Sequence, residues 1–110
     1  MELKRVVVTG LGAVTPVGNT PEETWKNLVA GKSGAAPITH FDTTNFKTKF
    51  ACEVKDLNVT DYLDRKEVRK MDRYTQLAMI SAIQGVKDSG LDLEKEDKTR
   101  IGVIYGVGIG

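Results

Sequence analysis

The stretch that decides the fold is RVVVTGLGAVTPVG, residues Arg5 to Gly18. Val6–Val8 form a short β-branched run that stops near a glycine, which predicts a strand buried on both faces and therefore a parallel sheet. The glycine-containing piece that follows is expected to be a loop. A strand that runs into closely spaced glycines raises one question, which is whether the loop cradles a phosphate or packs closely against another element.

The glycine spacing argues against a nucleotide site. A dinucleotide-binding fingerprint has the form G-x-G-x-x-G and enters a helix directly. Gly10 and Gly12 fit, but Thr15 stands where the third glycine belongs. A phosphate-binding loop of the form G-x-x-x-x-G-K-[ST] is also absent, because Lys26 stands where the first glycine before Gly31-Lys32-Ser33 is required. The sequence therefore favours a tight turn with closely packed small residues.

The first half of the chain predicts one helix and a long connection. Thr20 suits the N-cap, with proline at the first helical position and Glu23 at the third, so a helix is expected over Pro21–Ala30. Trp25 falls on its apolar face and is expected to be a core residue. Residues 31–50 have no steady period and read as an irregular connection, with an extended piece over Phe46–Val54.

The second half predicts a buried helix and a second strand. Tyr74–Val86 is strongly apolar and is followed by a Ser-Gly stop, residues 91–100 form a solvated connector, and Ile101–Tyr105 reads as a buried strand before three further glycines. The order of strands and helices is typical of an α/β protein with a parallel sheet. Two strands cannot cover so apolar a helix, so we expect residues 1–110 to be the N-terminal part of a larger α/β protein.

Composition excludes several broad classes. Sixteen basic and fifteen acidic side chains leave a net charge of +1, which gives no global argument for binding nucleic acid or a membrane surface. A single cysteine rules out a disulfide within the chain and is typical of a cytosolic protein. The first residues lack the features of a signal peptide, and no stretch approaches the roughly 18 apolar residues of a spanning helix.

A cluster of basic residues lies in RKEVRKMDR, residues 65–73. If the helix expected after Thr60 is continuous here, Lys66, Arg69, Lys70 and Arg73 share one face. Such a face is often only solvated and internally paired. The functional alternative is a docking surface for an acidic partner, either nucleic acid or an acidic protein.

The remaining reactive side chains have simple explanations. Cys52 lies between apolar residues with no base close in sequence, so we expect a small buried side chain rather than a nucleophile. His40 is expected to be a loop or packing histidine.

Taken together, these segments resemble the β-ketoacyl-acyl carrier protein synthases, most of all the type II enzymes of bacterial fatty acid synthesis. The segments that carry the resemblance occur in the family's order and cover nearly the whole chain: RVVVTGLGAVTPVGNTPEETW, GKSG, FDTTNFKTKFACEV, DRKEVRKMDRYTQLA, DSGL and RIGVIYGVGIG. The resemblance implies that residues 1–110 are the N-terminal portion of the first half of a thiolase-like α-β-α-β-α sandwich. The family works as a homodimer in the cytoplasm, and its chains are much longer than this one.

The resemblance also implies a reaction. The family lengthens fatty acids by decarboxylative Claisen condensation of malonyl-acyl carrier protein with an acyl group held on a cysteine. It uses no separate cofactor, because the substrates arrive on the phosphopantetheine arm of acyl carrier protein. The catalytic cysteine and histidines belong to motifs beyond residue 110, so neither Cys52 nor His40 takes those roles and these residues alone should be inactive.

Two family roles map onto this sequence. Lys66, Arg69 and Lys70 match the docking surface for the acidic carrier protein, and Ile109 matches the residue that gates the acyl-chain pocket. The sequence also leaves two other functions open. One is a non-catalytic relative, such as the chain-length partner subunit of a polyketide system. The other is a basic helical module that binds nucleic acid, which the near-neutral charge disfavours.

Overall fold

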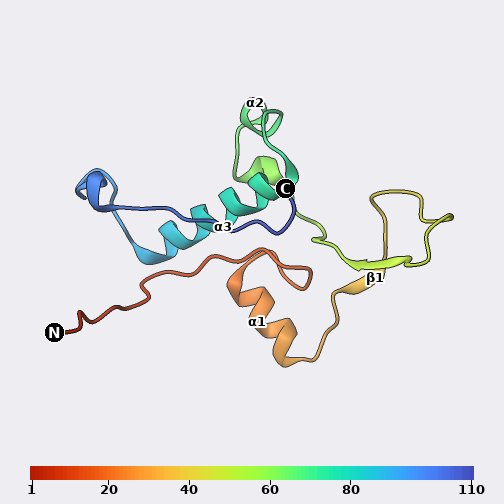
Figure 1. Cartoon of the computed structure of the whole chain (residues 1–110), viewed down its shortest axis with the longest axis horizontal. Helices are drawn as coiled ribbons and strands as arrows, with labels where there is room; N and C mark the ends of the chain where they lie inside the picture. Colours follow the sequence, from red (N-terminus) through yellow and green to blue (C-terminus); the bar gives the residue numbers. More distant parts are fainter.

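The computed structural model describes all residues from 1 to 110 and contains three α-helices, two strands and two 3₁₀ helices. In chain order these are α1 (Pro21–Val29), β1 (Ala35–Pro37), β2 (Phe50–Cys52), η1 (Val59–Asp61), α2 (Arg65–Val68), α3 (Arg73–Ser89) and η2 (Lys98–Arg100). Helix α3 runs through the middle of the molecule, with the N-terminal segment, α1 and the C-terminal segment around it (Figure 1).

The first helix begins as its sequence predicts. Thr20 is the N-cap, its hydroxyl accepts a hydrogen bond from the backbone N–H of Glu23 at 3.2 Å, and Pro21 opens the helix. The carboxylate of Glu23 accepts in turn from the backbone N–H of Asn19 at 2.8 Å. The expectation for Trp25 is wrong, because its side chain is 69% exposed.

The predicted helix after Thr60 is interrupted. Asp64 caps α2, and its carboxylate accepts from the backbone N–H of Lys66 at 2.7 Å. At Asp72 the backbone becomes extended, with ψ of 162°, before α3 begins. Asp72 occupies the N-cap position of α3 without a side-chain capping hydrogen bond, and its extended backbone separates α3 from α2.

Helix α3 confirms the predicted apolar helix and extends it at both ends. Gly90 takes the left-handed conformation after it, with φ of 67° and ψ of 14°, which glycine adopts without steric cost. Of its residues only Ile80 is fully buried, so the helix is less covered than its apolar sequence led us to expect.

The sheet differs from the predicted one. Strands β1 and β2 pair antiparallel, with Ala35 opposite Cys52 and Pro37 opposite Phe50. Neither Val6–Val8 nor Ile101–Tyr105 is a strand, so the predicted parallel sheet is absent from the structure. A strand requires hydrogen bonds to a neighbouring strand, and no second strand lies beside either segment in these 110 residues.

Little of the molecule is buried. Three of the 110 residues are buried, namely Gly18, Val59 and Ile80. The radius of gyration is 17.2 Å, against about 13 Å for a compact domain of this length. Val6 is 89% and Ile104 97% exposed, so apolar side chains of both predicted strands face solvent. No helix combines the length and apolar character that crossing a membrane requires.

Candidate functional site

The basic residues predicted as a docking surface surround one short helical turn. Lys66 lies in α2, and Arg69 is the C-cap of that helix. Lys70 follows in a turn, where its backbone N–H donates to the carbonyl of Glu67 at 3.0 Å. We call Lys66, Arg69 and Lys70 the docking turn. The prediction that one continuous helix face also carries Arg73 is wrong, because Arg73 belongs to the separate helix α3.

The three cations of the docking turn differ in their surroundings. The ammonium of Lys70 lies 2.9 Å from the carboxylate of Glu67, as both a hydrogen bond and an ion pair. Lys66 and Arg69 are exposed and take part in none of the molecule's four ion pairs. Two positive charges therefore face solvent freely, and the third is shared with a neighbouring acid.

Gln76 connects the docking turn to α3. Its side-chain amide donates to the carbonyl of Val68 at 3.3 Å and to that of Met71 at 3.1 Å. Val68 is the last residue of α2, and its carbonyl also accepts from the backbone N–H of Met71 at 3.2 Å, whereas Met71 lies beyond the helix. Sequence reasoning missed this residue, because its partners lie across the break between the two helices.

The two glycines of the opening stretch pack against α3. A Cβ on Gly10 would lie 2.3 Å from the carbonyl oxygen of Gly85, and one on Gly12 would lie 1.9 Å from that of Ser81. Both distances are far below any normal contact, so only glycine fits. The predicted close packing is confirmed, and the glycines serve contact between two segments of backbone rather than a phosphate.

Side chains of α3 bind the same segment. The backbone N–H of Leu11 donates to the carboxylate of Asp88 at 2.8 Å, and that of Ala13 donates to the carbonyl oxygen of the Gln84 side chain at 3.0 Å. The amide nitrogen of Gln84 donates to the backbone carbonyl of Asn19 at 2.7 Å. The backbone N–H groups of Leu11 and Ala13 are thus occupied by protein rather than available to a ligand.

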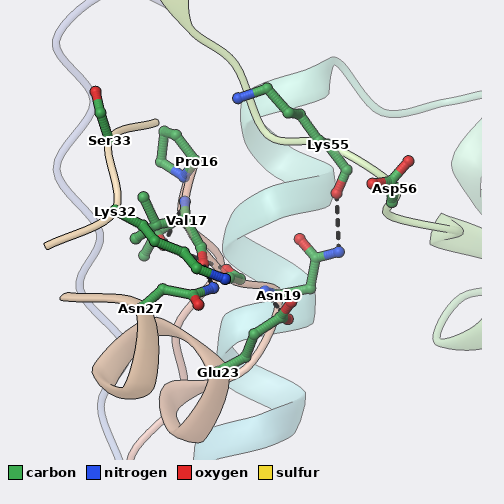
Figure 2. A pocket seen from close by; sticks show the side chains of 11 residues that line it. Pro16, Val17, Asn19, Glu23, Asn27, Lys32, Ser33, Lys55 and Asp56 are labelled. Atoms are coloured by element: carbon green, nitrogen blue, oxygen red, sulfur yellow. Dashed lines mark hydrogen bonds between the residues drawn. The ribbon is translucent and has the colours of Figure 1, made fainter. Parts of the chain in front are cut away.

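A polar pocket of about 240 Å³ lies between the end of the opening stretch, at residues 15–19, and the segments around Lys32 and Lys55 (Figure 2). Figure 2 shows the side-chain amide of Asn19 donating to the backbone carbonyl of Lys55, at 2.9 Å. Lys32 and Ser33 line the pocket from a loop after α1. A phosphate loop would stand at the start of a helix, so this position confirms that the Gly-Lys-Ser sequence is not one.

The candidate reactive residues lie near the β1–β2 hairpin. Cys52 is a free, exposed thiol in β2, so the expected burial of its side chain is wrong. His40 lies in the loop between the strands, as expected, with its Nε2 atom 3.7 Å from the Glu53 carboxylate. No group of three or more His, Cys, Asp or Glu side chains is arranged to hold a metal ion.

Glu53 organises that loop. Its carboxylate accepts from the hydroxyl of Thr39 at 2.8 Å and from the backbone N–H groups of Thr39 and His40. Partial burial raises the pKa of Glu53, but these hydrogen bonds and the charge of His40 outweigh it and hold the pKa below its ordinary value.

Ile109 lies in the C-terminal segment that runs back along α3 (Figure 1). Its side chain is 94% exposed. The segment from Tyr105 to Gly108 and the α3 residues Tyr74, Leu77, Ala78 and Ser81 line an open groove of about 310 Å³. Ile109 itself does not line that groove, so its role as an acyl gate stays a prediction.

The comparisons with known proteins point to one family. The family model described as the beta-ketoacyl synthase N-terminal domain matches residues 3–110. The chain belongs to the beta-ketoacyl synthase family. The chain is 50% identical over all its residues to the 3-oxoacyl-[acyl-carrier-protein] synthase 2 of Vibrio harveyi. It is 46% identical over its full length to the protein of the same name from Synechocystis.

This ketoacyl-synthase chain spans about a quarter of the length of those relatives, 26% in both cases. Among solved structures it resembles the ishigamide ketosynthase/chain length factor, with a TM-score of 0.74 and 39% identity over 80% of this chain and 22% of the other. The fold is therefore part of a thiolase-like α/β ketosynthase domain, which confirms the predicted class at that level.

Proposed function

We propose that the chain is the N-terminal part of a β-ketoacyl-acyl carrier protein synthase that elongates fatty acids. The observation that carries this proposal is the alignment of every residue, at about half identity, with relatives named 3-oxoacyl-[acyl-carrier-protein] synthase 2. In the proposed reaction an acyl group moves from its carrier to an enzyme thiolate. Malonyl-carrier then loses carbon dioxide, and its carbanion attacks the acyl thioester, which expels the thiolate and forms 3-oxoacyl-carrier.

The residues of this chain have two parts in that proposal. The docking turn binds the acidic carrier protein, and Ile109 limits how far an acyl chain enters its pocket. The docking role is supported by the free charges of Lys66 and Arg69 and by their position on an exposed turn. The cysteine and histidines of the chemistry are assigned to the family's later motifs, so residues 1–110 alone are expected to be inactive.

The proposal extends to the assembly. A homodimeric, cytoplasmic enzyme built as an α-β-α-β-α sandwich would cover the apolar side chains that are exposed here, including those of Val6 and Ile104. It would need no cofactor beyond the phosphopantetheine arm of its carrier substrate.

Charge reversal at the docking turn tests the proposal. In the full-length gene product, Lys66→Glu with Arg69→Glu should raise the KM for malonyl-acyl carrier protein about tenfold or more, because close charge pairs contribute strongly to such interfaces. The turnover number should change far less. Lys4→Glu with Lys47→Glu is the matched control, because both are exposed lysines outside the docking turn and the double change alters net charge equally. An unchanged KM in the double variant would contradict carrier docking at this surface.

One observation favours a second candidate. The solved relative includes a chain length factor in its name, and it aligns with this chain at 39% identity. A non-catalytic chain-length partner subunit would share this region. It would form no 3-oxoacyl-carrier from malonyl-carrier with either a fatty acyl or an acetyl primer, whereas a condensing enzyme would.

A further inference from the structure

One acidic side chain lies among the basic residues of the docking turn. Between Arg65 and Met71 the only carboxylate is that of Glu67, and it pairs with Lys70 at 2.9 Å. If the turn binds an acidic protein, this carboxylate occupies a cation that the partner would otherwise contact.

The geometry of the turn creates this pair. Helix α2 ends at Val68, and the backbone N–H of Lys70 donates to the carbonyl of Glu67, three residues earlier. This tight turn brings the two side chains together at a spacing that favours ion pairs. The Lys70 side chain is 70% exposed and that of Glu67 is 52% exposed, so water and salt weaken their attraction. Such a pair opens easily when a competing carboxylate arrives.

We propose that Glu67 is a built-in competitor that weakens carrier binding by occupying Lys70. This inference rests on the proposed carrier docking at the same turn. Lys66 and Arg69 make the first contacts with the acidic partner, and Lys70 joins only after its ion pair with Glu67 opens. A carrier protein must leave after each transfer, so an interface that is easily reopened serves turnover.

The experiment is a double-mutant cycle in the full-length gene product, with the dissociation constant of holo-acyl carrier protein measured at low and at physiological salt. Glu67→Gln keeps the size of the side chain and removes its charge. It should tighten carrier binding about twofold to fivefold at low salt and slow dissociation, since exposed charge pairs have effects of this size. In a Lys70→Met background the same change should have little effect.

The matched control is Glu94→Gln. Glu94 pairs with Lys98 at 3.5 Å on an exposed part of the chain away from the docking turn, so its loss alters net charge equally. It should leave carrier affinity unchanged. If Glu67→Gln tightens binding equally with and without Lys70, general charge repulsion is the cause and competition for Lys70 is overturned.

The two proposals fail in different ways. Unchanged carrier affinity after charge reversal at Lys66 and Arg69 would remove the docking surface and this inference together. Weakened binding in that variant, combined with no effect of Glu67→Gln, would keep the docking surface and overturn the competitor alone.

Discussion

At the scale of single residues, a steric contact at Gly12 fixes how the N-terminal segment packs on α3. Gly12 has no chemical role here, yet it determines how near the N-terminal segment can lie to α3, because a Cβ would sit 1.9 Å from the Ser81 carbonyl oxygen. The rigid backbone of a helix cannot yield to relieve such a clash.

Gly12→Ala should therefore destabilise the full-length gene product by about 1–3 kcal/mol, the range for forcing extra atoms into packed positions. Denaturant unfolding measures the loss. Lys47→Ala serves as the control, because that side chain is charged and exposed, so its loss should matter much less. Equal stability of the glycine variant and wild type would contradict the packing role.

Glu53 makes a prediction about pH. Its pKa is lowered in the folded chain, so its contribution to stability is present above the ordinary value of 4.5 and is lost as pH falls through the lower, folded value. Amide exchange of Thr39 and His40, followed by NMR, should accelerate below about pH 4.5 relative to the intrinsic rate. In Glu53→Gln this additional acceleration should disappear; if it persists, another group holds the loop.

At the scale of elements, the junction between α2 and α3 decides where the basic side chains lie. The sequence suggested one helix, but the extended backbone at Asp72 separates α2 from α3, and the side chain of Gln76 joins the end of α2 to α3. The docking turn is therefore positioned by a hydrogen bond from the neighbouring helix.

Gln76→Met retains a side chain of similar length but removes the amide that donates to the carbonyls of Val68 and Met71. The Met71 carbonyl then loses its side-chain donor, and the Val68 carbonyl keeps only the backbone N–H of Met71. Hydrogen exchange of Arg69 and Lys70 should therefore quicken by about fivefold, equivalent to a hydrogen bond of about 1 kcal/mol. Carrier affinity should fall in parallel. Unaltered exchange at these two amides would show that α2 holds its position without Gln76.

At the scale of the whole molecule, the exposed apolar surface dominates. A branched side chain that is 94% exposed, as Ile109 is, cannot limit an acyl chain unless other walls surround it. In the proposed enzyme those walls come from the remaining parts of the ketosynthase fold, so this test belongs to the full-length gene product.

Ile109→Phe should shorten the acyl chains that the enzyme accepts, because a larger ring leaves less length in the pocket. Condensation rates across acyl-carriers of increasing chain length measure this effect. Long acyl-carriers should lose at least about tenfold in rate while short ones change little, which corresponds to about 1.4 kcal/mol of lost transition-state stabilisation. A uniform loss at every length would contradict a gating role.

The sequence by itself determined those features that depend on neighbours along the chain. The start of α1 follows from Thr20 and Pro21, and the end of α3 follows from Gly90, because caps act through bonds within a few residues. The order of motifs was also sufficient to identify the family. The basic composition of the docking turn could likewise be read directly from residues 65–70.

Only the tertiary structure decided what those residues contact. The packing of Gly12 on α3 and the attachment of α2 through Gln76 depend on backbone geometry that no periodic pattern specifies. The segments Val6–Val8 and Ile101–Tyr105 were predicted to be strands but are not strands in the structure. Their β-branched residues favour strands, but a strand exists only where a neighbouring strand satisfies its backbone hydrogen bonds.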